Sequence, residues 1–334
     1  MRGCTWPAIR SPSSTRASVS RSSACARSPT TRGCATRTST SCTSTASSAA
    51  CWRRRPPPTA CARRHRGPSA TPPTTSARRW CCCVPRRGAK THLRVCALYP
   101  EVMNIYADRG NLLLLERRCH WRGLGFELRA VSFGDELDPD AHDVFYLGGG
   151  QDRDQRLCAF DLVAAKRDAL HAAADRGALV LGICGGLQLL GHSYALGDEE
   201  IPGLGLVDLH TVRGAGPRLV GDVAIEVELD PGQRRVLAGF ENHGGRTHLG
   251  PGEQPLGRVL RGHGNTGQSG EEGVRRGSVI GTYLHGPLLP KNAWLADWLI
   301  TTATGVDPLI TLDDTLENAA HASARRAAGL SAEG

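Results

Sequence analysis

The amino-acid sequence predicts an α/β protein: a single domain with a mainly parallel central sheet flanked by helices, preceded by a disordered extension. Two observations support this prediction. From residue 93, short apolar runs alternate with amphipathic stretches over roughly 100 residues, which is typical of strand–helix–strand units. Residues 1–90 contain only three residues among Leu, Ile, Val and Phe, too few to offset the chain entropy lost on folding.

Charge and cysteine content also change near residue 90. The 334 residues carry a formal net charge of +9. Residues 1–90 hold 18 of the 41 Lys and Arg and none of the 32 Asp and Glu, so the remaining 244 residues carry 23 bases, 32 acids and a net charge of −9. Nine of the 13 cysteines lie in the first 90 residues. The part of the chain that can fold is therefore acidic.

The four cysteines beyond residue 90 are Cys96, Cys119, Cys158 and Cys184. A secreted disulfide framework needs paired cysteines throughout a compact domain, so these four are expected to be free thiols in a cytoplasmic protein. No run of about 20 apolar residues, the length needed to cross a membrane, occurs in the sequence. We therefore expect no membrane span.

The extension is assigned to residues 1–92 and is expected to be disordered, because its Arg, Ser, Thr, Pro, Ala and Cys show no hydrophobic period. A transit peptide would be amphipathic, a nucleic-acid-binding tail would carry aromatic residues, and a zinc site would have spaced Cys and His pairs. None of these patterns is present, so no nucleic-acid partner or metal is expected. The abrupt change at Leu93 instead favours a true start near residue 93.

The first half of the domain, which is assigned to residues 93–305, alternates strands and helices. Its helices have apolar residues three and four positions apart, and one strand is apolar throughout, as expected for burial on both faces. In chain order we expect a strand at 93–98, a helix at 107–123, strands at 126–133 and 144–147, a helix at 155–174, a strand at 178–183 and a helix at 185–196.

The second half of the domain is richer in turns and short strands. Strands are expected at 220–229 and 279–284, and a helix with proline at its start is expected at 290–301. The stripe of Trp294, Leu295, Trp298 and Leu299 on that helix is interpreted as core packing. Residues 306–334 are assigned to a C-terminal tail.

The most informative string is Gly-Ile-Cys-Gly-Gly-Leu-Gln at residues 182–188, where a buried strand meets a helix. A strand, a sharp turn and a helix form a nucleophile elbow. Gly182 and Gly186 would remove Cβ atoms that clash where the two elements cross. Cys184 would lie at the helix N-terminus, which favours the thiolate, and the N–H of Gly185 could bind an oxyanion. A buried core cysteine is the alternative interpretation.

A cysteine nucleophile needs a base, and His285 is the best candidate. It follows the apolar strand 279–284 and precedes Gly286-Pro287, so it is expected at a strand end. The other histidines of the domain lack this setting. Together Cys184 and His285 predict acyl transfer, in which a thiolate attacks a carbonyl and an imidazolium protonates the leaving amine.

These strings, with Tyr-Leu-His-Gly-Pro at residues 283–287, resemble the class I glutamine amidotransferases, and specifically the cobyric-acid-synthase-like branch. The common form has Glu two residues after the histidine, where this chain has Pro287. The resemblance therefore implies a Cys/His dyad whose orienting acid comes from elsewhere in the fold or from a partner. Strings at residues 104–111, 148–152 and 239–243 narrow the resemblance, over residues 93–302, to glutaminase subunits of bacterial lipid II isoglutaminyl synthase.

The resemblance implies a role for each matching residue. Cys184 would attack the side-chain amide of L-glutamine and form a glutamyl thioester, with His285 as general acid and then as base. Backbone N–H groups of Gly149, Gly150 and Gly185 would form the oxyanion hole. The glycine loop could alternatively be a plain turn between a strand and a helix.

Two further side chains match positions that bind glutamine in these enzymes. Arg218 would bind the α-carboxylate, for which a guanidinium fork is suited. Gln188, one helical turn beyond Cys184, would help to hold the substrate. A surface ion pair for Arg218 and an exposed helix position for Gln188 are the alternatives. Asn242 and His243 are expected in the wall of the site or at the partner interface.

The implied partner is a MurT-type ligase subunit that forms a heterodimer with this chain and acts on lipid II. No Walker A string occurs here, so ATP and Mg²⁺ are expected on the partner and no cofactor on this chain. Alternatives are another amidotransferase of the same branch, acting on a corrinoid, and a stand-alone Cys/His amidohydrolase. A non-enzymatic protein with a nucleic-acid-binding tail is the third.

Overall fold

The computed structural model of the protein describes residues 88–105 and 108–332. The disorder expected for the extension 1–92 therefore falls, except for its last five residues, outside the described residues. None of the described helices is both long and apolar enough to cross a membrane.

The central sheet has six strands in the order β13-β14-β4-β3-β1-β2. All neighbouring strands run parallel except the edge pair β13 and β14, so the predicted mainly parallel sheet is confirmed. Its apolar residues, and those of the helices that cover it, form the main hydrophobic core. The strands are β1 (His92–Leu98), β2 (Gly125–Val131), β3 (Val144–Leu147), β4 (Leu179–Ile183), β13 (Val274–Arg276) and β14 (Val279–Thr282).

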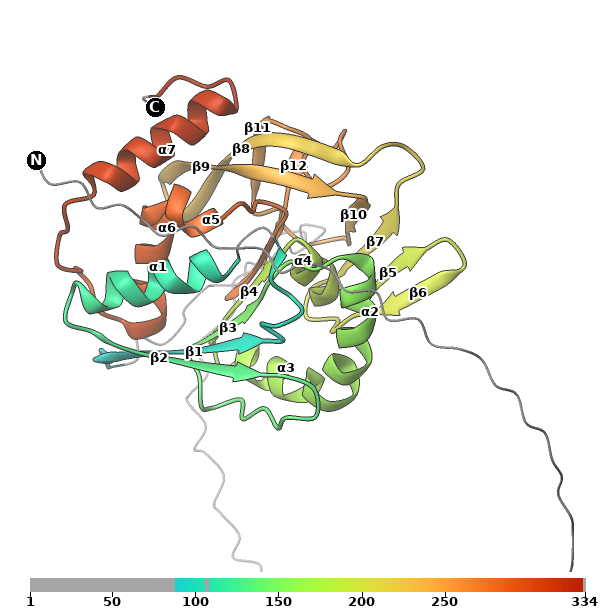
Figure 1. Ribbon diagram of the computed structural model, residues 1–334, viewed down its shortest axis with the longest axis horizontal. Coiled ribbons are helices and arrows are strands. Elements are labelled where there is room, and N and C mark those ends of the chain that lie inside the picture. Colours follow the sequence, from blue (N-terminus) through green and yellow to red (C-terminus); the bar gives the residue numbers. More distant parts are fainter. Residues whose placement is uncertain (1–87, 106–107, 333–334) are drawn as a thin grey trace, which may run out of the picture. The chain divides into compact units, whose positions relative to one another are not determined.

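Helices cover both faces of this sheet, as predicted. Figure 1 shows α1 and α6 on one face and α3 on the other, while α4 starts at the end of β4. The helices are α1 (Arg109–His120), α2 (Asp152–Asp161), the π-helical η2 (Leu162–Lys166), α3 (Arg167–Asp175), α4 (Gly185–Leu190), α5 (Leu288–Lys291), α6 (Ala293–Thr304) and α7 (Thr315–Ala327).

Two four-stranded sheets, which the sequence patterns did not resolve, complete the fold. Their strand orders are β10-β7-β5-β6 and β12-β11-β8-β9. The β8–β9 hairpin pairs from Leu219 with His243 to Asp230 with Gln233. The strands are β5 (Ser193–Leu196), β6 (Glu199–Pro202), β7 (Leu209–Arg213), β8 (Leu219–Asp230), β9 (Gln233–His243), β10 (Gly245–Leu249), β11 (Gly257–Arg261) and β12 (Glu271–Glu272).

The expected helix 185–196 is wrong in its second half. Helix α4 ends at Leu190, and β5 then pairs with β6 and β7. The break occurs at Gly191, where an added Cβ would lie 2.1 Å from Cδ1 of Leu209. Close approach of β7 therefore requires glycine at this point and ends the helix after six residues.

Residues 306–334, which were assigned to a tail, contain helix α7. Ala324 of α7 and Ala328, directly after it, pack with Ala224 of β8 and Ala238 of β9 in a small apolar cluster. Small side chains on both sides let the helix approach the hairpin closely. The alanine-rich composition of this segment is thus suited to helix packing.

Candidate active site

Cys184 occupies a sharp turn between β4 and α4. Its backbone has φ 51° and ψ −102°, a left-handed conformation that is uncommon for a residue with a Cβ atom. The residue is 7% exposed, and its N–H donates to the carbonyl of Thr282 at 2.8 Å. Strained residues of this kind persist only where the surroundings impose them, and they cluster at functional sites. The geometry is that of the predicted elbow.

The two glycines of the elbow are required by close packing, as the sequence predicted. A Cβ atom on Gly182 would lie 2.8 Å from the backbone of Gly186, where strand and helix cross. A Cβ atom on Gly186 would lie 2.2 Å from the carbonyl oxygen of Leu147 at the end of β3. Any larger residue at position 186 would push α4 away from the sheet.

His285 leaves the sheet at the same edge as Cys184. Strands β4 and β14 are parallel neighbours, with Ile183 aligned with Thr282, so the residues after both strands emerge together. His285 is fully buried. Its backbone is fixed by two hydrogen bonds with Phe240 of β9, of 2.9 and 3.1 Å. The string at residues 239–243, which was used only for the resemblance, thus holds the predicted base in place.

Burial favours the neutral forms of both Cys184 and His285, the predicted dyad. Burial raises the pKa of Cys184 to about 12, and the charge of Asp108 adds to this shift, whereas Arg218 and the N–H of Gly185 oppose it. Burial lowers the pKa of His285 to about 4, and the neighbouring positive charges add to this effect. The sequence predicted a thiolate favoured by the helix N-terminus. Desolvation opposes that thiolate, while the N–H of Gly185 at the start of the helix favours it, so the thiolate stays a prediction.

The glycine loop after β3 packs against the elbow. A Cβ atom on Gly149 would lie 3.5 Å from the Cβ of Cys184, and one on Gly185 would lie 2.9 Å from the nitrogen of Gly150. However, the N–H of Gly149 donates to Oδ2 of Asp108 at 2.6 Å. The predicted oxyanion hole of Gly149, Gly150 and Gly185 stays a prediction, and one of its donors is already engaged.

Gln188 is buried rather than an exposed helix residue. It is 3% exposed, and its Nε2 donates to the hydroxyl of Tyr283 at 3.2 Å. That hydroxyl also bonds to Oγ1 of Thr247 at 2.6 Å, and Thr247 bonds to Thr211 at 2.8 Å. The amide of Gln188 is therefore part of an internal polar network, and its predicted contact with substrate remains untested.

Arg218 is exposed and lies at the start of the β8–β9 hairpin. Its Nε and Nη2 donate to the side-chain and backbone oxygens of Asn242, both at 2.7 Å. Its charge acts on both Cys184 and His285, lowering the pKa of each. An exposed guanidinium close enough to affect both dyad residues is suitably placed to bind an anionic group of a substrate.

Sequence reasoning assigned no role to three buried acids around the site. Asp108 bonds to the glycine loop, Glu241 accepts the N–H groups of His263 and Gly264, and Glu272 accepts the N–H of Tyr283 at 2.6 Å. Asp108 and Glu241 lie in the strings at residues 104–111 and 239–243 that carry the family resemblance, so the sequence could have indicated that both lie near the site. Glu272 lies in a two-residue strand with no sequence pattern that could have indicated its burial.

His243, expected in the wall of the site, packs flat on the ring of Tyr283 with centroids 3.5 Å apart. Its Nδ1 bonds to the carbonyl of Gly245 at 2.9 Å, and its Nε2 lies 3.8 Å from Glu241. It is among the charges that lower the pKa of His285. The structure thus brings His243 close to the predicted base and buries it, while Asn242 holds Arg218.

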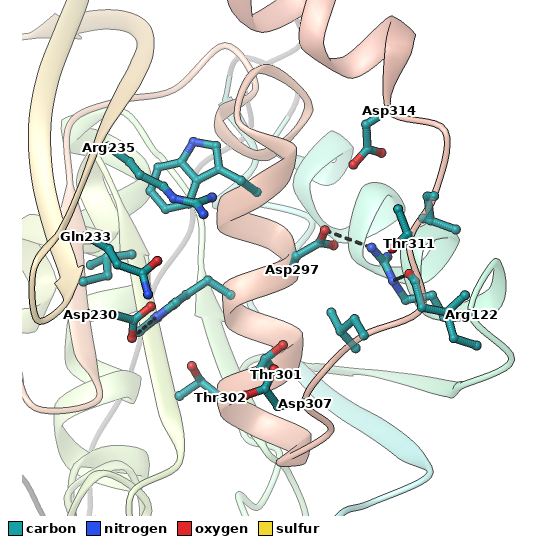
Figure 2. Close-up of a pocket in the computed structure, with 16 residues that line it drawn as sticks. Arg122, Asp230, Gln233, Arg235, Asp297, Thr301, Thr302, Asp307, Thr311 and Asp314 are labelled. Atoms are coloured by element: carbon teal, nitrogen blue, oxygen red, sulfur yellow. Dashed lines mark hydrogen bonds and ion pairs between the residues drawn. The ribbon is translucent and has the colours of Figure 1, made fainter. Parts of the chain in front are cut away.

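A groove among the described residues lies away from Cys184 and His285. It has a volume of about 560 Å³, and Figure 2 shows Arg235 and Asp230 on one side of it and Arg122 and Asp314 on the other. None of the predicted site residues lines it. Trp294 and Trp298 do, and both are only half-buried. The interpretation of the stripe on α6 as core packing therefore holds for Leu295 and Leu299, which are buried, and only in part for the tryptophans.

Comparison with known proteins gives one family match and three similar proteins. Residues 94–293 match the model of the CobB/CobQ-like glutamine amidotransferase domain. The lipid II isoglutaminyl synthase (glutamine-hydrolyzing) subunit GatD of Streptococcus pneumoniae is 39% identical over 213 residues, which cover 63% of this chain and 80% of that protein. The GatD subunit of Staphylococcus aureus is 38% identical over 202 residues, covering 60% and 80%. The cobyric acid synthase of Xanthobacter autotrophicus is 40% identical over 172 residues, covering 48% of this chain and 32% of that protein.

Proposed function

Because this chain belongs to the CobB/CobQ-like glutamine amidotransferase family, we propose that it is the glutaminase subunit of a lipid II isoglutaminyl synthase. It would hydrolyse L-glutamine and deliver the ammonia to a MurT-type ligase subunit. With ATP and Mg²⁺, that subunit would amidate the D-glutamate of the lipid II stem peptide in peptidoglycan synthesis. The reaction would take place in the cytoplasm at the inner face of the membrane.

The extent of the matches favours this function over corrinoid amidation. The chain covers 80% of each GatD relative but 32% of the cobyric acid synthase, whose remaining length has no counterpart in the match. The family match also agrees with the resemblance that the elbow and the glycine loop predicted. The conformation of Cys184 is the observation that carries the proposal, because a buried core cysteine needs no left-handed backbone.

The chemistry follows from the two side chains at the sheet edge. Sγ of Cys184 would attack the side-chain carbonyl carbon of glutamine while His285 accepts the thiol proton. His285 would then protonate the departing nitrogen, which releases ammonia and leaves a glutamyl thioester. In the second half, His285 would take a proton from water, which attacks the thioester and yields glutamate.

The neutral state of the dyad makes this chemistry dependent on further groups. A thiol with a raised pKa and an imidazole with a lowered pKa transfer a proton unfavourably. A bound substrate would exclude water. Together with the ligase subunit, it would supply the charge that Glu provides in the common form of these enzymes and that Pro287 lacks. Arg218 would bind the α-carboxylate of glutamine in exchange for one of its contacts with Asn242.

The test compares Cys184→Ser with Cys158→Ser, each co-expressed with the MurT-type ligase. Cys158 is buried on α2 and belongs to the core, so it provides a matched control. We expect Cys184→Ser to abolish amidation of lipid II with glutamine as nitrogen donor while amidation with ammonium salt survives. Cys158→Ser should keep both activities. Glutamine-dependent amidation by the Cys184→Ser complex would overturn the proposal.

A further inference from the structure

Asp108 binds the backbone group that is expected to stabilise the oxyanion. It lies directly before α1, its side chain is 1% exposed, and its Oδ2 is 2.6 Å from the nitrogen of Gly149. The carbonyl of Gly149 is held by the same segment, because it accepts the N–H of Ile105 at 3.0 Å. Both backbone polar groups of Gly149 are thus bound by residues just ahead of α1.

The same carboxylate lies close to the nucleophile. A Cβ atom built on Gly149 would be 3.0 Å from Oδ2 of Asp108 and 3.5 Å from the Cβ of Cys184, so Gly149 contacts both residues. The charge of Asp108 opposes ionisation of the Cys184 thiol. Oδ1 of Asp108 is buried and finds no hydrogen-bond partner among the residues that the structure describes. Burial raises the pKa of Asp108 to about 7.

A carboxylate oxygen and the oxyanion of a tetrahedral intermediate compete for a donor of this kind. Both are anionic acceptors, and a charge-assisted hydrogen bond to either is about twice as strong as a neutral one. An ionised Asp108 would also repel an oxyanion formed next to it. The donor is therefore available to the reaction only after the carboxylate has moved or become neutral.

We propose that Asp108 is a positioning residue that competes with the oxyanion for the N–H of Gly149 and so keeps glutamine hydrolysis slow until glutamine and the ligase subunit displace its carboxylate. This inference rests on the proposed function and deepens it. It explains how a glutaminase subunit avoids releasing ammonia without an acceptor. In this role Asp108 acts through Gly149 and Cys184, and no contact between Asp108 and the substrate is required.

The test uses Asp108→Asn in the isolated chain, with Asp152→Asn as the matched control. The charge of Asp152 also raises the pKa of Cys184, but its carboxylate pairs with Arg213 and holds no group of the glycine loop. We expect Asp108→Asn to raise kcat for glutamine hydrolysis about fivefold or more, with KM nearly unchanged, because a neutral acceptor competes less well for the donor. Asp152→Asn should change kcat at most about twofold.

The pH dependence of alkylation of Cys184 by iodoacetamide gives a second readout, which loss of a purely structural contact would not move. The carboxylates of Asp108 and Asp152 and the guanidinium of Arg218 are the charged groups that act on this thiol. Asp108→Asn should shift the alkylation profile to lower pH, and Asp108→Ser, which also removes the carboxylate, should change kcat and the profile in the same direction. Thermal unfolding shows which variants are folded.

Two results separate the failure of this inference from the failure of the proposed function. If the wild-type chain hydrolyses glutamine and folded Asp108→Asn or Asp108→Ser hydrolyses it more slowly or at the same rate, the inference is overturned. Asp108 would then only anchor the loop. Absence of glutamine hydrolysis in every form, with and without the ligase subunit, would overturn the proposed function itself.

Discussion

The carbonyl of Thr282 accepts the backbone N–H of Cys184 at 2.8 Å, which ties the turn at Cys184 to the strand that leads to His285. The hydroxyl of Thr282 in turn donates to the carboxylate of Glu272 at 3.0 Å. Glu272 also accepts the N–H of Tyr283. One buried carboxylate therefore fixes the end of β14, to which the turn at Cys184 is bonded and from which His285 follows.

This arrangement predicts an effect of pH on stability. Burial raises the pKa of Glu272 to about 8, with a further contribution from the charge of Glu241. A Glu in the unfolded chain titrates near pH ~4.3, so the folded protein binds the extra proton between these values. The free energy of unfolding contributed by this group must fall as pH rises from about 4.3 to 8, by up to about 1.4 kcal/mol per pH unit. Glu272→Gln, which keeps the acceptor and removes the charge, should abolish this loss.

Urea unfolding of wild type and Glu272→Gln at pH 5, 6, 7 and 8 measures the difference. The variant should gain stability relative to wild type as pH increases. Glu228→Gln is the control, because Glu228 is exposed and its pKa is lowered by the N–H of Gly232 and by Arg234. Its difference from wild type should stay constant above about pH 5. A parallel pH dependence of wild type and Glu272→Gln would contradict the prediction.

A second prediction concerns the packing of the elbow. In Gly186→Ala the new Cβ would lie 2.2 Å from the carbonyl oxygen of Leu147, so α4 must shift from the sheet. We expect the variant to lose roughly 1–3 kcal/mol of unfolding free energy, as overpacked cores do, and to lose glutaminase activity because Cys184 moves with the helix. Gly221→Ala, on β8 with nothing within 4 Å of its added Cβ, should stay within about 0.5 kcal/mol of wild type.

The sequence was informative wherever a local pattern reflects a packing requirement. Alternating apolar runs predicted β1, β3 and β4 to within a residue or so, because strands buried on both faces must be apolar. The elbow was predictable because glycine at positions 182 and 186 is needed where backbones cross. A left-handed Cys184 follows from that geometry.

Features that depend on contacts between distant residues could not be predicted. Helix α4 ends where β7 packs on Gly191, and nothing near residue 191 indicates which strand lies there. The raised pKa of Cys184 follows from burial and from Asp108, which is 76 positions away in the sequence. Likewise, Glu272 accepts hydrogen bonds from Thr282 and Tyr283 only because the fold brings β12 to the same edge of the sheet.

A third prediction concerns glutamine binding by Arg218. Arg218→Lys keeps the positive charge but loses the planar fork that suits a carboxylate. We expect KM for glutamine to rise about tenfold, the effect of roughly 1.4 kcal/mol of binding energy, with kcat less affected. Arg234→Lys on the same hairpin, where the side chain is 70% exposed and pairs with Glu226 and Glu228, is the control. Steady-state kinetics of the ligase complex should show the KM effect for position 218 alone.

The last prediction separates a structural from a binding role for Gln188. In Tyr283→Phe the hydroxyl that pairs with Gln188 and Thr247 is removed, and both partners stay buried. Thr247 keeps its bond to Thr211, but Nε2 of Gln188 loses its partner. Leaving one buried donor unsatisfied costs about 1–3 kcal/mol, so the unfolding free energy should fall by about that amount. If Gln188 also binds glutamine, loss of the Tyr283 hydroxyl will leave the Gln188 amide misaligned with the substrate, and KM for glutamine will rise. Tyr194→Phe, which loses a longer bond to Asp152, is the control and should lose less stability with KM unchanged. A stable Tyr283→Phe variant would show that the network does not hold the amide, whereas a destabilised variant with normal KM would restrict Gln188 to the interior.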